Sequence, residues 1–113
     1  MRQRWRDFRG RVFVAERDHR LVGLAGVDEC WLHGLYVVPG EWGTGVATAL
    51  HDHALGAMDG CSEAHLWVLQ ENHRARRFYE RRGWRLNGTT RVVPFPPNPL
   101  DVGYSLTFAS SSL

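Results

Sequence analysis

Apolar runs separated by polar turn residues in the first third of the chain predict three β-strands. Two runs rich in β-branched and aromatic residues, 12–16 and 21–27, flank a short polar turn, which is typical of a hairpin. A third apolar run covers 30–38 and ends at Pro39, since proline cannot donate to a strand ladder. We therefore expect three consecutive antiparallel strands.

From Thr44 the apolar period changes from two residues to a helical spacing, which continues until Gly60. A buried strand is predicted over 64–69. Asn72 then has the character of a helix N-cap, and Gly83 is suited to the position just after the last helical turn. Two further strands are expected, one beginning at residue 84 and one over 102–108.

The predicted order is strand, strand, strand, helix, strand, helix, strand, strand. This order indicates an α+β fold, with a mixed, mostly antiparallel sheet and helices packed on it. The 113 residues suit a single domain with one core. We divide it into a basic N-terminal segment (1–11), a core (12–108) and a Ser-rich tail (109–113).

Charge is distributed unevenly along the chain. All 14 basic residues are arginine, and they fall within 2–20 and 74–91. The stretch 21–73 between them contains no arginine or lysine and seven acidic residues, a charge of −7. Such polarity can attract an anionic partner, either a nucleic acid or a phosphorylated cofactor.

Several other features narrow the class of protein. No run approaches the length of a membrane span, and the arginine-rich start is unlike a signal peptide, so we expect a cytoplasmic protein. Cys30 and Cys61 match no zinc spacing and are expected to be buried free thiols, with a single disulfide between them as the alternative. His51 and His53 point apart on a helix, so we expect surface histidines and no metal site.

The most informative segment is the junction of a predicted strand and helix, Pro39-Gly40-Glu41-Trp42-Gly43-Thr44-Gly45-Val46-Ala47. Its glycines allow a tight turn, and the first helical turn offers unpaired amides at the positive end of the helix dipole. Such a junction can hold phosphate. An ordinary turn with glycines chosen for conformation is the alternative. No lysine follows the glycines, so the segment is not a P-loop.

Two strings in this order resemble the GNAT N-acetyltransferase family. L-Y-V-V-P-G-E-W-G-T-G-V-A-T-A-L is similar to the family's acyl-CoA diphosphate loop, and L-W-V-L-Q-E-N-H-R-A-R-R-F-Y-E-R-R-G-W is similar to its following strand and helix. With the strand order, the resemblance covers roughly residues 12–108. It implies transfer of an acyl group, usually acetyl, from coenzyme A to an amine by direct attack in a ternary complex.

The resemblance also implies roles for individual residues. Tyr79 would protonate the leaving thiolate as a general acid, and a purely structural aromatic on the buried face of the helix is the alternative. Asn72 would contact the cofactor arm. The pantetheine and the thioester carbonyl would be held by Leu35, Tyr36 and Val37. The diphosphate would be cradled by Trp42, Gly43, Thr44, Gly45, Val46 and Ala47, largely through backbone amides.

A base must remove a proton from the attacking amine, and His33 is the first candidate. It would lie on the strand face shared with Trp31 and Leu35. Members of the family often have glutamate at the position of Trp31, so the acidic pattern is absent here. Glu29 is a weaker candidate, and a strand-edge or core histidine is the alternative for His33.

The chain departs from the family pattern in two further ways. Trp42 occupies a position where glutamine or arginine is usual. Only eleven residues precede the first predicted strand, where members have a strand and two helices. The acceptor side would then be open or completed by a second subunit, or the chain would be a shortened form. We therefore consider a homodimer, and a non-catalytic acyl-CoA-binding module as the alternative function. The arginine-rich helix is interpreted as a solvated face rather than as a nucleic-acid surface, and the acceptor and the acyl chain length stay open.

Overall fold

The computed structural model describes residues 2–7 and 11–108, so the predicted tail, 109–113, lies outside the described residues. By its internal contacts the chain divides into two compact units, residues 1–61 and 62–113. We call them the first and the second unit and describe each by itself.

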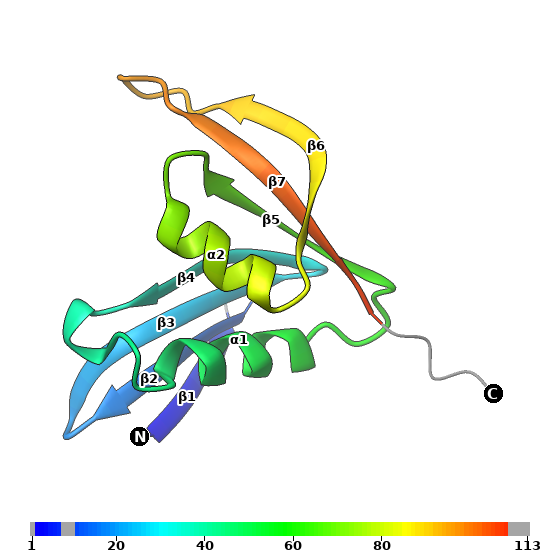
Figure 1. Ribbon diagram of the computed structural model, residues 1–113. Coiled ribbons are helices and arrows are strands. Elements are labelled where there is room, and N and C mark those ends of the chain that lie inside the picture. Colours follow the sequence, from blue (N-terminus) through cyan, green and yellow to red (C-terminus); the bar gives the residue numbers. More distant parts are fainter. Residues whose placement is uncertain (1, 8–10, 109–113) are drawn as a thin grey trace. The chain divides into compact units, whose positions relative to one another are not determined.

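The first unit contains four strands, each antiparallel to the next: β1 (Arg2–Asp7), β2 (Arg11–Arg17), β3 (Arg20–Asp28) and β4 (Trp31–Val37) (Figure 1). The last three confirm the strands predicted from the apolar runs. Their alternating burial places one face of this sheet in the core of the unit.

Strand β1 lies in the segment that we expected only to be basic. It pairs with β2 over its whole length, from Arg2 opposite Glu16 to Asp7 opposite Arg11. Trp5 is the one apolar residue among its six, so the sequence carries no strand pattern there. Only residues 8–10 separate β1 from β2, too few for the two helices that members of the resembled family have before their hairpin.

The turn between β2 and β3 consists of Asp18 and His19, both in the left-handed region with φ of 53° and 64°. Two left-handed central residues give the hairpin turn whose twist matches that of the strands. As a result Arg17 and Arg20 face each other at the end of the hairpin.

Helix α1 (Val46–Gly56) packs on the sheet of the first unit. The helix approaches the sheet closely at Gly23, where a Cβ atom would lie 2.8 Å from Leu50 Cδ1 and 2.9 Å from the Tyr36 carbonyl oxygen. A glycine is therefore required for this contact. The fully buried residues between the helix and the sheet include Ala15, Ala25, Val46, Leu50 and Ala54.

The structure corrects the prediction of two free thiols. Cys30, in the turn between β3 and β4, forms a disulfide with Cys61, which follows α1. The two residues are 31 positions apart, and the loop they close encloses β4 and α1. Spacing in the sequence could not reveal this pairing, because it depends on the way the helix returns across the sheet.

His51 is also placed differently from the prediction of two surface histidines. It is only 3% exposed, and its Nδ1 lies 2.9 Å from Asp52 Oδ1. His53 is exposed as expected, and its ring packs edge-on against Phe13 with 4.8 Å between the centroids. The burial of His51 follows from its position beside Leu50 on the helix face turned toward the sheet.

The second unit contains β5 (Glu63–Leu69), α2 (His73–Arg81), β6 (Arg85–Val92) and β7 (Leu100–Thr107). Strand β7 lies between β5 and β6 and is antiparallel to both (Figure 1). These elements confirm the predicted strand, helix, strand, strand order. Neither α1 nor α2, the α-helices of the described part of the chain, is long and apolar enough to cross a membrane.

Both ends of α2 confirm the expected signals. The Asn72 side chain accepts a hydrogen bond from the Ala75 amide at 3.1 Å, as an N-cap does. Gly83 adopts φ of 93°, the left-handed conformation that ends a helix. These two signals set the bounds of α2, which connects β5 to β6 along the chain.

Candidate functional site

The junction between β4 and α1 is built as a glycine loop, which we define as residues 39–47. A short 3-10 turn, Pro39–Glu41, follows β4, and α1 begins at Val46. Gly43 and Gly45 have φ of 81° and 92°, and a Cβ on either would meet no heavy atom within 4 Å. Glycine is therefore needed here for backbone conformation, and the loop faces open space.

The backbone at the start of α1 is suited to bind an anion. The first hydrogen bond of α1 runs from the Ala49 amide to the Gly45 carbonyl oxygen at 3.0 Å. The amides of Val46 and Ala47 come before this bond in the first turn of α1, where backbone amides have no carbonyl acceptor within the helix. Together with the positive end of the helix dipole, these donors favour a phosphate group.

The Trp42 side chain forms a hydrogen bond with the last residue of β4. Its Nε1 donates to the Val37 carbonyl oxygen at 3.0 Å, and the side chain is 49% exposed. The indole has only one N–H donor, and this donor is engaged within the loop. Trp42 thus does not replace the side-chain donor of a glutamine or arginine, and the predicted phosphate contacts are those of backbone amides.

The Glu41 side chain links two parts of the first unit, Arg17 at the end of β2 and Thr44 in the glycine loop. Its Oε2 accepts from Arg17 Nε at 3.0 Å, and its Oε1 lies 3.0 Å from the Thr44 hydroxyl oxygen. The Thr44 hydroxyl also lies 2.7 Å from the Glu41 carbonyl oxygen. Arg17 and Glu41 are 24 positions apart, so the local sequence pattern did not identify this pair.

Strand β4 contains a bulge at the candidate base, His33. Gly26 pairs with Gly34 and Val27 with Leu32, so that His33 is the extra residue without a partner in the ladder. A bulge redirects the side chains on either side of it, and bulges are frequent beside active sites. The bulge decides which face of the sheet His33 occupies.

His33 lies on the face opposite α1, together with Trp31 and Asp28. Its ring stacks on Trp31 with 6.3 Å between centroids, and its Nε2 lies 3.8 Å from Asp28 Oδ2. The side chain is 57% exposed, and the neighbouring glycine pair, Gly26 and Gly34, leaves the surface beside it open. Asp28 was not identified from the sequence, because it comes near His33 only through the bulged pairing.

The expectation that Leu35 shares the face of His33 is wrong. Leu35 pairs with Ala25, which is fully buried on the α1 side, because the bulge shifts the alternation by one residue. Val37 is buried on the same side, while Tyr36 is 56% exposed. The predicted contacts of these three residues with pantetheine stay predictions.

Tyr79, the candidate acid, lies on the buried side of α2 in the second unit. It is 6% exposed, and its ring packs edge-on against Phe78 and Trp84, with centroid distances of 5.5 Å and 5.9 Å. Burial raises the pKa of the Tyr79 phenol to about 12. The hydroxyl therefore remains protonated at neutral pH, as a proton donor requires.

A polar network that sequence reasoning missed fixes α2 on its sheet. Tyr104 on β7 accepts from Arg76 Nε at 2.9 Å and donates to Glu80 Oε2 at 2.5 Å. Arg76 Nη1 also donates to the Gln70 carbonyl oxygen at 2.9 Å. Burial of the Tyr104 side chain raises the pKa of its phenol. Arg76 is thus a structural residue rather than part of a solvated face.

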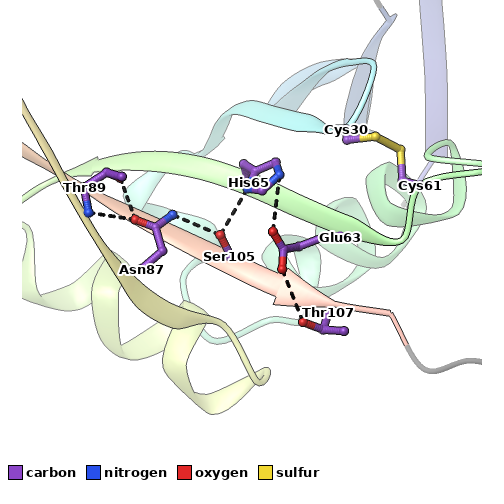
Figure 2. Close-up of polar contacts among 8 residues, drawn as sticks. All are labelled: Cys30, Cys61, Glu63, His65, Asn87, Thr89, Ser105 and Thr107. Carbon is purple, nitrogen blue, oxygen red and sulfur yellow. Dashed lines mark hydrogen bonds and ion pairs between the residues drawn. A yellow bond between two sulfur atoms is a disulfide. The ribbon is translucent and has the colours of Figure 1, made fainter.

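A second polar cluster joins the three strands of this unit (Figure 2). His65 Nδ1 lies 3.0 Å from Ser105 Oγ, which accepts from Asn87 Nδ2 at 2.9 Å. His65 Nε2 lies 3.6 Å from Glu63 Oε1. These residues belong to β5, β7 and β6 in turn, so the cluster connects the strands across the face opposite the Leu66 and Tyr104 side chains.

The predicted site residues are divided between the two units, and each unit is described by itself. The first unit brings the glycine loop, Trp42 and the Arg17–Glu41 pair together at one end of its sheet, and it places His33 on the face away from α1. The second unit holds Tyr79 in its core and uses the Asn72 side chain oxygen as a helix cap.

Comparison with proteins of known sequence identifies relatives. An uncharacterized N-acetyltransferase of Mycobacterium tuberculosis is 39% identical over 90 residues, which are 74% of this chain and 58% of that protein. An uncharacterized N-acetyltransferase of Archaeoglobus fulgidus is 37% identical over 81 residues, 60% of this chain and 55% of that one. The chain therefore spans little more than half the length of these relatives.

Solved structures confirm the predicted fold class. Nourseothricin acetyltransferase superposes with a TM-score of 0.79 at 24% identity, over 88% of this chain and 65% of that one. A Bacillus anthracis structure solved in complex with acetyl coenzyme A gives 0.76 at 17% identity, over 91% and 65%. An N-acetyltransferase from Thermoplasma acidophilum in complex with coenzyme A gives 0.72 at 20%, over 86% and 60%.

The model of the acetyltransferase (GNAT) family matches residues 1–84, which include the glycine loop, the candidate base on β4 and the whole of α2. This match covers well over half of the chain and agrees with the fold of the solved structures. The chain therefore belongs to the GNAT acetyltransferase family.

Proposed function

We propose that this chain takes part in transfer of an acetyl group from acetyl-CoA to an amine by direct attack in a ternary complex. The observation that carries the proposal is the glycine loop, whose two left-handed glycines and first-turn amides suit the diphosphate of coenzyme A. Relatives named N-acetyltransferases and a similar structure solved with acetyl coenzyme A support the choice of donor.

The surface around His33 supports an amine as the acceptor. A protonated amine is attracted by the Asp28 carboxylate and by the face of Trp31, a carboxylate and an aromatic ring within one exposed patch. The amine must lose a proton before it attacks, and His33 is the imidazole within reach of that patch. In this proposal Asp28 orients His33, and His33 accepts the proton.

Tyr79 supplies the second proton transfer in this proposal. The departing sulfur of coenzyme A takes a proton from the Tyr79 hydroxyl, which burial keeps neutral. The phenylalanine variant retains the ring packing against Phe78 and Trp84 and removes only the donor.

The test combines binding with product detection. Calorimetric titration with acetyl-CoA should show one site, and mass spectrometry of an amine panel should show an added acetyl mass. Tyr79→Phe should lower turnover about 100-fold while the affinity for CoA changes less than about twofold. An unchanged turnover would remove Tyr79 from the mechanism.

The same experiment addresses the alternative function, a non-catalytic acyl-CoA-binding module. The absence of glutamate at the position of Trp31 favours this alternative, since the acidic base pattern of the family is missing. Acetyl-CoA binding without acetylation of any amine would support it. A homodimer and a cytoplasmic location remain proposals, for which gel filtration and cell fractionation are the measurements.

A further inference from the structure

A carboxylate lies within the loop that should receive a polyanion. Glu41 belongs to the glycine loop, and its side chain is only 15% exposed. The surrounding stretch, 21–73, has no arginine or lysine and a charge of −7. An unpaired carboxylate at this place would repel a diphosphate and weaken its binding.

The compensating cation comes from another part of the first unit. Arg17, at the end of β2, donates its Nε to Glu41 Oε2 at 3.0 Å. The other carboxylate oxygen lies 3.0 Å from the Thr44 hydroxyl oxygen. A continuous polar chain therefore runs from Arg17 through Glu41 to Thr44, whose amide lies between the two left-handed glycines of the loop.

We propose that Arg17 is a positioning residue of the diphosphate site, which neutralises Glu41 and holds it in place so that the glycine loop can accept the diphosphate of coenzyme A. This inference rests on the proposed function. It assigns Arg17 an indirect role, through Glu41, and it explains how a strongly acidic stretch can contain a site for an anion.

Arg20 provides a matched control within the same hairpin. It lies directly opposite Arg17 in the pairing of β2 and β3, it is exposed, and it has no side-chain polar contact among the described residues. Replacing either arginine by methionine removes the same charge from the same turn. Only the Arg17 variant leaves Glu41 without its cation.

The experiment measures ligand affinity for the wild type, Arg17→Met and Arg20→Met, with CoA by calorimetry and with pantetheine by NMR titration. At about 50 mM salt Arg17→Met should weaken CoA binding about tenfold, the loss expected for one charged interaction. Binding of pantetheine, which has no phosphate, should change less than about twofold. Arg20→Met should leave both affinities within about twofold of the wild type.

Salt dependence separates this role from a purely structural one. Electrostatic repulsion between Glu41 and the diphosphate is screened by salt, so the CoA deficit of Arg17→Met should shrink at about 500 mM salt. The double variant Arg17→Met/Glu41→Gln, which lacks the carboxylate, should bind CoA within about threefold of the wild type. Circular dichroism melting of each variant verifies that the protein is folded.

Four results would overturn the inference: wild-type CoA affinity in Arg17→Met, an equal loss in Arg20→Met, an equal loss for pantetheine, or no recovery in the double variant. A wild-type protein that binds no CoA would instead overturn the proposed function, and this inference with it. The two failures are thus distinguishable by the wild-type titration alone.

Discussion

The glycine loop of the first unit and the surroundings of Tyr79 in the second unit are built in opposite ways. In the loop, backbone conformation at Gly43 and Gly45 presents amides to open space. Around Tyr79, ring packing encloses a single hydroxyl and changes its acidity. A binding site formed by backbone amides tolerates an unusual side chain such as that of Trp42. A site that depends on one side-chain hydroxyl does not tolerate loss of that hydroxyl.

The two units also differ in how they are held together. The first unit is cross-linked by the Cys30–Cys61 disulfide, and the second unit relies on the packing of Trp84 and Tyr104, both almost completely buried. A covalent link acts by restricting the unfolded chain, while packing acts in the folded state. The following changes test these differences, from the largest expected effect to the smallest.

Removing the disulfide should give the largest effect and should be confined to the first unit. For a loop of 31 residues, the chain-entropy model predicts a loss of about 4 kcal/mol in the free energy of unfolding. Hydrogen exchange of Cys30→Ser/Cys61→Ser should show faster exchange in β4 and α1 than in β5 and β7. Reducing agent should leave the double variant unchanged. Equally accelerated hydrogen exchange in both units would contradict the expectation that the disulfide stabilises only the first unit.

Raising the pH should destabilise the second unit through Tyr79. The neutral phenol is favoured in the folded state, since its pKa is about 12 when folded against about 10 when unfolded. Stability is therefore complete below pH 10 and falls between pH 10 and about 12, by about 3 kcal/mol. Urea unfolding at a series of pH values measures this loss.

The matched control for the alkaline effect is Tyr79→Phe. This variant cannot ionise at that position, so its stability should fall less steeply above pH 10 than that of the wild type. The buried Tyr104, whose pKa is also raised, should account for part of the remaining slope. Identical slopes in both proteins would show that the Tyr79 phenol does not titrate as its burial implies.

Adding one methyl group at Gly23 tests the packing of the first unit. Gly23→Ala would place a Cβ at 2.8 Å from Leu50 and 2.9 Å from a backbone oxygen, so we expect a loss of about 2 kcal/mol in unfolding free energy. Gly26→Ala is the control, since its Cβ would meet only His33 Cβ, at 3.8 Å. Similar melting temperatures for the two variants would contradict the close approach of α1.

The smallest effect is expected in the glycine loop itself. Gly45→Ala places a side chain at φ of 92° in open space, so the cost of about 1 to 2 kcal/mol is conformational and should appear as weaker CoA binding by about tenfold. Gly40→Ala, also in open space but without a left-handed φ, is the control and should bind normally. Calorimetry compares the two variants.

Much of the fold and part of the site follow from the sequence, because their signals are local. Apolar runs and helical spacing are set by neighbours a few residues apart, and they identified β2, β3, β4 and both helices. Asn72 and Gly83 act on the backbone next to them and were correctly assigned as caps. The glycine loop was recognisable for the same reason, since its left-handed conformation is set by consecutive residues.

Tertiary structure alone decided the remainder, because these features join residues distant in the chain. The Cys30–Cys61 disulfide spans 31 positions and the Arg17–Glu41 pair spans 24, so neither has a spacing that a local pattern can contain. The bulge at His33 depends on pairing with β3, and it moved Leu35 to the opposite face. The acidity of Tyr79 depends on the aromatic packing that surrounds it. Such contacts are fixed only when the strands and helices pack together.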